Sequence, residues 1–142
     1  MRRLRFLSAD QLVALHAELL SRWGGAGGGG HRGASYEGVD AAVQAVKNSY
    51  YDNTVDLAAA YAVYIVQGHV FFDGNKRTGA AAMRVFLEIN GTAIRPPSLE
   101  IASKMIELQT RSEAGESTRA LIAWLAAWLR AYKKTRRAAP KR

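Results

Sequence analysis

Apolar residues repeat at the spacing of an α-helix in six stretches of this 142-residue chain, and glycine, proline or a capping residue separates each stretch from the next. In the first stretch, Leu12, Leu15 and Leu19 lie three and four residues apart, which places them on one face of a helix. Ser8 and Gln11 precede them at the spacing of a capping box. The repeats therefore predict an all-α fold.

The limits of the expected helices follow from the breakers and caps. The first helix ends at Gly24-Gly25, and the second carries Val39 to Val46 and ends near Asn48. The third is capped by Asn53 or Thr54 and ends at Gly68, and the fourth opens after Gly74 and ends at Asn90-Gly91. The fifth is capped by Ser98 and runs through Leu108, and the sixth is capped by Ser117 or Thr118 and includes Tyr132. A chain of this length, 49% hydrophobic, suits one compact domain, which we place at residues 1–132.

Three segments fall outside the expected helices. Residues 24–30 contain six glycines and predict a loop, because glycine makes regular structure entropically costly. We expect residues 31–38 to form a short extended flap. Residues 133–142 are rich in Lys and Arg and are expected to form a basic, disordered tail.

The formal net charge of +8 raises the alternative of a basic helical module that binds nucleic acid without catalysis. However, ten of the twenty Lys and Arg residues lie within residues 1–5 and 130–142, which contain no acid. The remaining ten are set against twelve Asp and Glu residues. The basicity therefore belongs to the ends of the chain rather than to a binding face.

The chain contains no cysteine, which excludes disulfides and thiolate metal sites and fits a reducing, cytoplasmic location. No apolar stretch approaches the length that spans a membrane, so we expect no membrane partner.

Residues 69–77 read His-Val-Phe-Phe-Asp-Gly-Asn-Lys-Arg and carry more chemistry than a connector between two helices needs. A helix N-terminus offers free N–H groups and a positive dipole end, so the turn at Gly74 and Asn75 predicts a phosphate site. Lys76 and Arg77 would neutralise charge on a transferring phosphoryl group. Asp73 is the one acid of the turn, and a lone carboxylate beside phosphates is a common way to hold Mg²⁺.

His69 is the candidate general base, because an imidazole can accept a hydroxyl proton near neutral pH. Phe71 is expected to plug into the core and fix the loop. His16 and His31 have no carboxylate or histidine partner at ligand spacing, and we expect them to be structural or incidental.

The pattern H-x-F-x-D-G-N-K-R resembles the active-site signature of the Fic/Doc (Fido) domain family, and specifically its death-on-curing toxin branch. The flanking helices resemble this family across most of the chain, which implies a bundle with the active-site loop at the N-terminus of a central helix. The resemblance implies His69 as the general base, Asp73 as the Mg²⁺ ligand, and nucleotide phosphates on the loop that runs from Gly74 through Asn75 to Arg77.

Two positions separate the reactions known in the family. The branch that transfers AMP has glycine after the asparagine and a second arginine three residues beyond the first, where this chain has Lys76 and Ala80. Lysine at the first position resembles the Doc branch, which transfers the γ-phosphate of ATP. We therefore expect a protein kinase that uses ATP and Mg²⁺, with a protein adenylyltransferase as the alternative.

The resemblance also implies partners. It implies a protein substrate with a Ser or Thr hydroxyl, with elongation factor Tu as a candidate and inhibition of translation as the outcome. The family's internal inhibitory pattern, [ST]-x-x-x-E-[GN], is missing, because its one candidate at Glu37-Gly38 has Gly33 at the Ser/Thr position. Inhibition is therefore expected from a separate cognate antitoxin, and contact with DNA is expected only through that antitoxin. A basic helical module that binds nucleic acid or this antitoxin without catalysis is the further alternative.

Overall fold

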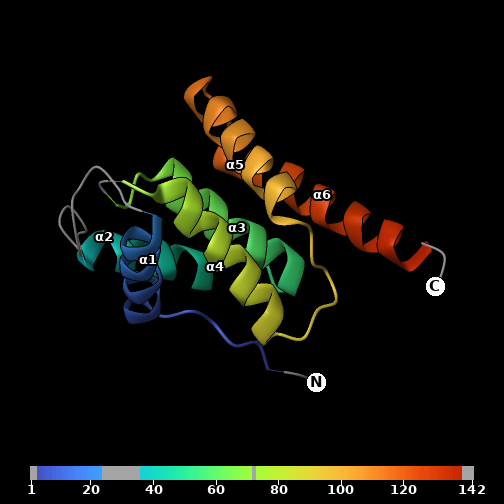
Figure 1. Ribbon diagram of the computed structural model, residues 1–142, viewed down its shortest axis with the longest axis horizontal. Helices are drawn as coiled ribbons and strands as arrows, with labels where there is room; N and C mark the ends of the chain where they lie inside the picture. Colours follow the sequence, from blue (N-terminus) through green and yellow to red (C-terminus); the bar gives the residue numbers. More distant parts are fainter. Residues whose placement is uncertain (1–2, 24–35, 72, 139–142) are drawn as a thin grey trace.

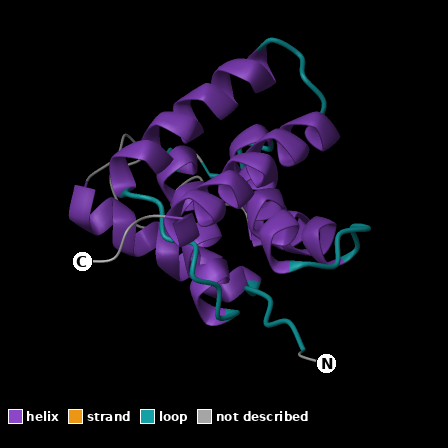
Figure 2. Ribbon diagram, turned by 90° about the vertical axis from the view of Figure 1, so that its right-hand side faces the viewer, coloured by secondary structure: helices purple, strands orange, loops and turns teal. Residues whose placement is uncertain are grey.

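The computed structural model describes residues 3–23, 36–71 and 73–138 of the chain. Within these residues the chain forms six helices and no strand (Figure 2). The helices are α1 (Ala9–Trp23), α2 (Tyr36–Lys47), α3 (Thr54–Gln67), α4 (Asn75–Ile89), α5 (Ser98–Glu113) and α6 (Thr118–Ala138). The all-α prediction is confirmed, and the helices follow in the predicted order.

Helices α3 and α4 form the centre of the bundle. α3 packs against α2, α4, α5 and α6, and α4 packs against α1, α3 and α5. In Figure 1 the two cross the middle of the molecule, with α1 and α2 on one side and α5 and α6 on the other. Residues 57–63 of α3 are all buried, as are Ile65 and Val66. A helix that is apolar around its whole circumference belongs in the interior of a bundle.

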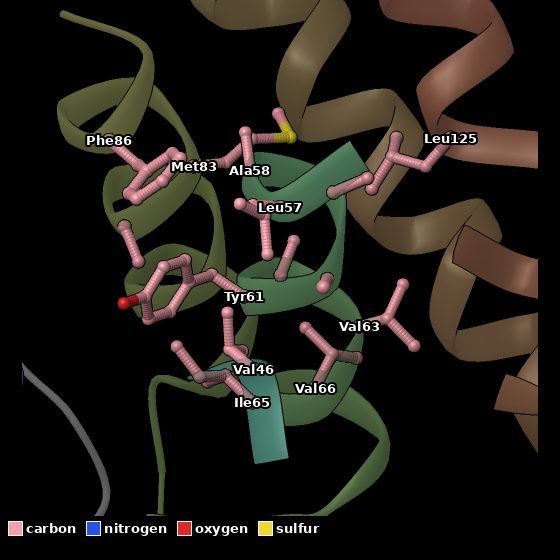
Figure 3. Close-up of a cluster of buried hydrophobic side chains, with 14 of the residues drawn as sticks. Val46, Leu57, Ala58, Tyr61, Val63, Ile65, Val66, Met83, Phe86 and Leu125 are labelled. Carbon is pink, nitrogen blue, oxygen red and sulfur yellow. The ribbon is translucent and has the colours of Figure 1, made fainter. Parts of the chain in front are cut away.

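Side chains of four helices meet in the core that Figure 3 shows. Tyr61 of α3 and Phe86 of α4 are both buried, with ring centroids 5.2 Å apart. Val46 of α2 and Leu125 of α6 are buried in the same cluster. Each large apolar side chain contributes about 1.5–3 kcal/mol when it leaves water. The core therefore fixes α3 and α4 firmly, and residues 68–74 connect them.

Polar side chains cap several helices as predicted. Ser8 and Gln11 form the reciprocal capping box, with N–H to oxygen distances of 2.8 and 3.1 Å. Asn53 caps α3 by accepting a hydrogen bond from the N–H of Asp56 at 3.0 Å. The Ser117 hydroxyl accepts from the first turn of α6 at 3.1 Å. Each such cap satisfies a helix N–H that lacks a partner within the helix.

Two predicted boundaries need correction. Pro97, with φ −63° and ψ 150°, is the N-cap of α5, so Ser98 is its first helical residue rather than its cap. Proline supplies the extended cap geometry through its fixed φ. α2 begins at Tyr36, so residues 36–38 of the predicted flap are helical. Glu37 lies in that first turn, where a negative charge favours the helix dipole.

The predicted glycine loop and residues 31–35 of the predicted flap lie outside the described residues. The backbone of α6 continues to Ala138, into the segment predicted as a basic tail, and residues 139–142 again lie outside the described residues. In the described part of the chain, no helix has both the length and the apolar character needed to cross a membrane.

The segment before α1 is bound to the core at two points. The N–H of Leu7 donates to the Tyr61 hydroxyl at 2.8 Å, and that hydroxyl donates to the Leu7 carbonyl at 3.2 Å. The side-chain amide of Asn90 accepts from the N–H of Arg5 at 2.8 Å and donates to its carbonyl at 3.0 Å. Burial raises the pKa of Tyr61 to about 12, against the opposing effect of its hydrogen bond to Leu7.

Candidate active site

The turn between α3 and α4 begins with a Schellman motif, in which two backbone N–H groups return to carbonyls of the last helical turn. Gly68 is the C-cap of α3. The N–H of His69 donates to the carbonyl of Val66 at 3.4 Å, and the N–H of Val70 donates to that of Ile65 at 3.5 Å. The motif requires a left-handed residue just after the cap, and His69 takes this position with φ +47°.

His69 is therefore a strained residue as well as a candidate base. A left-handed conformation costs an L-residue with a Cβ roughly 1–2 kcal/mol, so glycine usually fills this position. Here the glycine stands one residue earlier, because a Cβ at Gly68 would lie 2.6 Å from the carbonyl oxygen of Tyr64. The His69 side chain is exposed. Strain of this kind often accompanies a functional residue, because glycine would be more stable at the same backbone position and the side chain must then have another reason to be there.

Phe71 anchors the middle of the turn in the core. It is buried, and its ring stacks on that of His16 with centroids 3.9 Å apart and an interplanar angle of 8°. The side-chain amide of Asn75 closes the turn, because it accepts from the N–H of Phe71 at 2.9 Å and donates to its carbonyl at 2.8 Å. The predicted structural role of Phe71 is confirmed. Asn75, predicted to bind phosphates, uses both groups of its side chain on the turn itself.

His16 of α1 holds the end of the turn. Its Nε2 lies 2.8 Å from the backbone carbonyl oxygen of Asp73. Gly74 follows with φ +83° and ψ 17°, a left-handed conformation, and forms the N-cap of α4. A Cβ at Gly74 would lie 3.6 Å from the His16 ring, which is ordinary contact, so glycine is required there by backbone conformation rather than by space.

The start of α4 has the properties of an anion site. Gly74 offers no side-chain cap, and the first turn of α4 contains no acid. Lys76 and Arg77 lie in this turn and are both exposed. Two cations at the positive end of a helix dipole are unfavourable unless an anion joins them. The arrangement therefore suits a phosphate group, which backbone N–H groups and cations would contact together.

The Lys76 ammonium donates a hydrogen bond to Oε1 of Gln109 on α5 at 2.7 Å. Beside this contact lies a cavity of about 560 Å³ between α1, α4 and α5. Lys76 and Arg77 line one part of it, while Leu19 and Met105 are among its apolar residues. Because most of the lining is apolar, the cavity suits an apolar or amphipathic group rather than a triphosphate.

Asp73 fits a metal site that is completed by a ligand rather than by the protein. Within residues 3–23, 36–71 and 73–138, no group of three or more acidic or histidine side chains could hold a metal ion. Mg²⁺ commonly takes one or two carboxylates and fills its other positions with phosphate oxygens and water. One carboxylate next to an anion site matches that donor set.

The sequence motif alone did not reveal the part that His16 plays. His16 is 1% exposed, lies 57 residues from Asp73 in sequence and touches the turn from another helix. A usable signal was present, because His16 falls on the apolar face that carries Leu12 and Leu19. A histidine on such a face is buried and needs a hydrogen-bond partner.

Comparison with known proteins agrees with this geometry. The family model described as Fic/DOC family matches residues 6–87, which include α1 to α3, the turn and most of α4. The chain is also 36% identical over 94 residues to the protein named "Protein kinase doc" of Escherichia phage P1. That alignment covers 64% of this chain and 72% of the phage protein.

Proposed function

This chain belongs to the Fic/DOC family, and from that premise we propose that it is a toxin that transfers the γ-phosphate of ATP to a Ser or Thr hydroxyl of a protein. The observation that carries the proposal is the turn at residues 68–74. It presents an exposed imidazole in a strained conformation at one end and an uncapped, cationic helix start at the other. The His69 end is held by backbone hydrogen bonds to the last turn of α3, and the Asp73 end is held by the buried side chain of His16 on α1.

In the proposed reaction, the imidazole of His69 accepts the proton of the target hydroxyl as its oxygen attacks the γ-phosphorus. The bond between the γ-phosphorus and the bridging oxygen breaks, and ADP leaves. The backbone N–H groups at the start of α4, with Lys76 and Arg77, stabilise the charge on the phosphate oxygens. Asp73 would hold Mg²⁺, which supplies further neutralisation of the phosphates when bound.

The side chain of Asn75 has a different part in this scheme. Because both groups of its amide are bound to Phe71, we propose that it contributes to phosphate binding through its backbone N–H and through the shape of the turn. Gly74 contributes in the same way, since its left-handed conformation starts α4 without a side chain that could cover the N–H groups.

Lys76 supports phosphate transfer over AMP transfer. The phage relative that is 36% identical to this chain over 94 residues is named a protein kinase. In this chain Lys76 is exposed and its hydrogen bond to Gln109 is between two surface side chains. Such contacts contribute about 1 kcal/mol or less, so the ammonium can turn to a bound phosphate at small cost.

The toxin proposal includes partners. We propose a cognate antitoxin as the inhibitor, elongation factor Tu as the first target to test, and the cytoplasm as the place of action. Contact with DNA is proposed only through the antitoxin. Arg130, part of the basic C-terminal segment, binds Asp56 at 3.0 Å and Asn53 at 3.0 Å, which supports a structural rather than a nucleic-acid role for this residue.

The decisive experiment incubates the full chain with cell extract, Mg²⁺ and ATP labelled on either the α or the γ phosphate. We expect one labelled protein with γ-label and none with α-label. Label from the α position would transfer the assignment to the adenylyltransferase alternative.

Two matched histidine variants control this experiment. His69→Ala should abolish labelling, whereas His31→Ala should leave it unchanged, because the motif gives His31 no role. Labelling that survives His69→Ala would contradict the proposed base.

A further inference from the structure

The side chain of His16 contacts two residues of the turn from the neighbouring helix α1. Its ring stacks on Phe71, and its Nε2 lies 2.8 Å from the Asp73 carbonyl oxygen. The ring also lies beside Gly74, where an added Cβ would be 3.6 Å from it. A side chain with a packing role alone would need only the first of these contacts.

The hydrogen bond fixes the tautomer of the ring. A backbone carbonyl can only accept, so Nε2 must carry the hydrogen and donate it to Asp73. The other ring nitrogen, Nδ1, is buried and has no hydrogen-bond partner among the described residues. Burying an unpaired polar atom costs stability, and a phenylalanine could keep the stack without that cost. Histidine at this position is therefore explained by the bond to Asp73 and not by packing.

The same bond sets the direction of the peptide group between Asp73 and Gly74. In a trans peptide, the carbonyl and the N–H point in opposite directions. Because the Asp73 carbonyl points to the buried His16 ring, the N–H of Gly74 points away from it. Rotation of this peptide would break the bond to His16 and reverse the N–H at the entrance to α4.

We propose that His16 is a positioning residue of the phosphate-transfer site, which holds the 73–74 peptide so that the Gly74 N–H and the first N–H groups of α4 face the nucleotide phosphates. This inference rests on the proposed function, because Mg-ATP is the ligand that the N–H groups would meet. His16 touches no reacting atom and acts through Asp73 and Gly74.

The experiment compares three variants of the full chain. His16→Phe keeps the volume and the stack but removes the donor. His16→Gln loses the ring but places an amide N–H near the former Nε2. Leu12→Val, on the same buried face of α1, is the control for a general loosening of that helix.

Binding of Mg-ATP is measured by calorimetry, and thermal unfolding and the backbone amide signal of Gly74 are followed by circular dichroism and NMR. We expect His16→Phe to bind Mg-ATP about 10-fold more weakly, the size of effect that a single lost hydrogen bond produces. We expect its melting temperature to stay close to that of wild type and its Gly74 amide signal to shift. His16→Gln should recover most of the binding, and Leu12→Val should bind as wild type does.

The outcomes separate this inference from the proposed function. If the wild-type chain binds Mg-ATP and His16→Phe binds it equally tightly, the positioning role is wrong and the proposed function stands. If NMR places the ring hydrogen on Nδ1, the role is also wrong, whatever the binding result. A wild-type chain that binds no Mg-ATP overturns both proposals.

Discussion

Replacing His69 by glycine should make the protein more stable while removing its activity. In the left-handed position after the C-cap, a side chain with a Cβ costs roughly 1–2 kcal/mol, which glycine does not incur. Glycine also has more conformational freedom in the unfolded chain, which stabilises the unfolded state by about 0.4–1 kcal/mol and offsets part of that benefit. The net expectation is a stabilisation of about 0.5–1 kcal/mol relative to wild type.

His69→Ala is the informative comparison, because alanine also removes the imidazole but keeps the Cβ and therefore the strain. We expect the glycine variant to be about 1 kcal/mol more stable than the alanine variant, or roughly 3 °C higher in melting temperature for a domain of this size. Urea unfolding gives the free energy, and thermal unfolding followed by circular dichroism gives the melting temperature.

The control is Ala123→Gly on the exposed face of α6, where glycine should instead destabilise by about 1 kcal/mol. If His69→Gly is no more stable than His69→Ala, the assignment of backbone strain to His69 is wrong. If the glycine variant still transfers phosphate, the assignment of His69 as the base is wrong.

Three further changes test the architecture around the turn. Asn75→Ala loses both hydrogen bonds that close the turn, and we expect a loss of about 1–3 kcal/mol in urea unfolding together with weaker Mg-ATP binding; unchanged binding would contradict the role given to this amide. Gly79→Val should cost several kcal/mol, since a Cβ at Gly79 would already lie 3.0 Å from Val66, and a well-folded variant in thermal unfolding would refute this tight contact between α3 and α4. The pKa of Tyr61 is raised from its ordinary value of 10.0 to about 12, so between these pH values the folded state keeps the phenol proton that the unfolded state loses. The free energy of unfolding should therefore fall by about 1 kcal/mol per pH unit from pH 10 to 12. The Tyr61→Phe variant should lack this component of the pH dependence, and identical slopes for the two proteins would exclude it.

Local patterns were sufficient to predict most of the fold. The capping box at Ser8 and Gln11, the Asn53 cap and the end of α4 at Asn90 each depend on residues within one helical turn, and the structure has them where the sequence predicts them. The resemblance to the Fic/Doc family came from a nine-residue motif and is confirmed by the family match.

Contacts between distant segments could not be predicted in the same way. Nothing near His16 in the sequence indicates that its partner is the carbonyl of Asp73, because backbone groups carry no sequence signal. The sequence also does not indicate a left-handed residue at His69, because Gly68 is the local choice for that conformation. In the structure the glycine at position 68 instead accommodates the close approach to the Tyr64 carbonyl oxygen. The roles given to the residues of the motif remain predictions that the experiments above test.

The attachment of the segment before α1 has a consequence for how the chain can be trimmed or extended. Arg5 is hydrogen-bonded to the side chain of Asn90, the C-cap of α4, and Leu7 to that of Tyr61 on α3. Helix α1 follows directly and carries His16 in its third turn. These hydrogen bonds hold the segment before α1 against the core, and we expect them to help fix the position of α1 relative to α4. A protease that removed the first seven residues would leave every reacting group in place but would remove these hydrogen bonds. A fusion partner joined ahead of residue 3 would leave them intact.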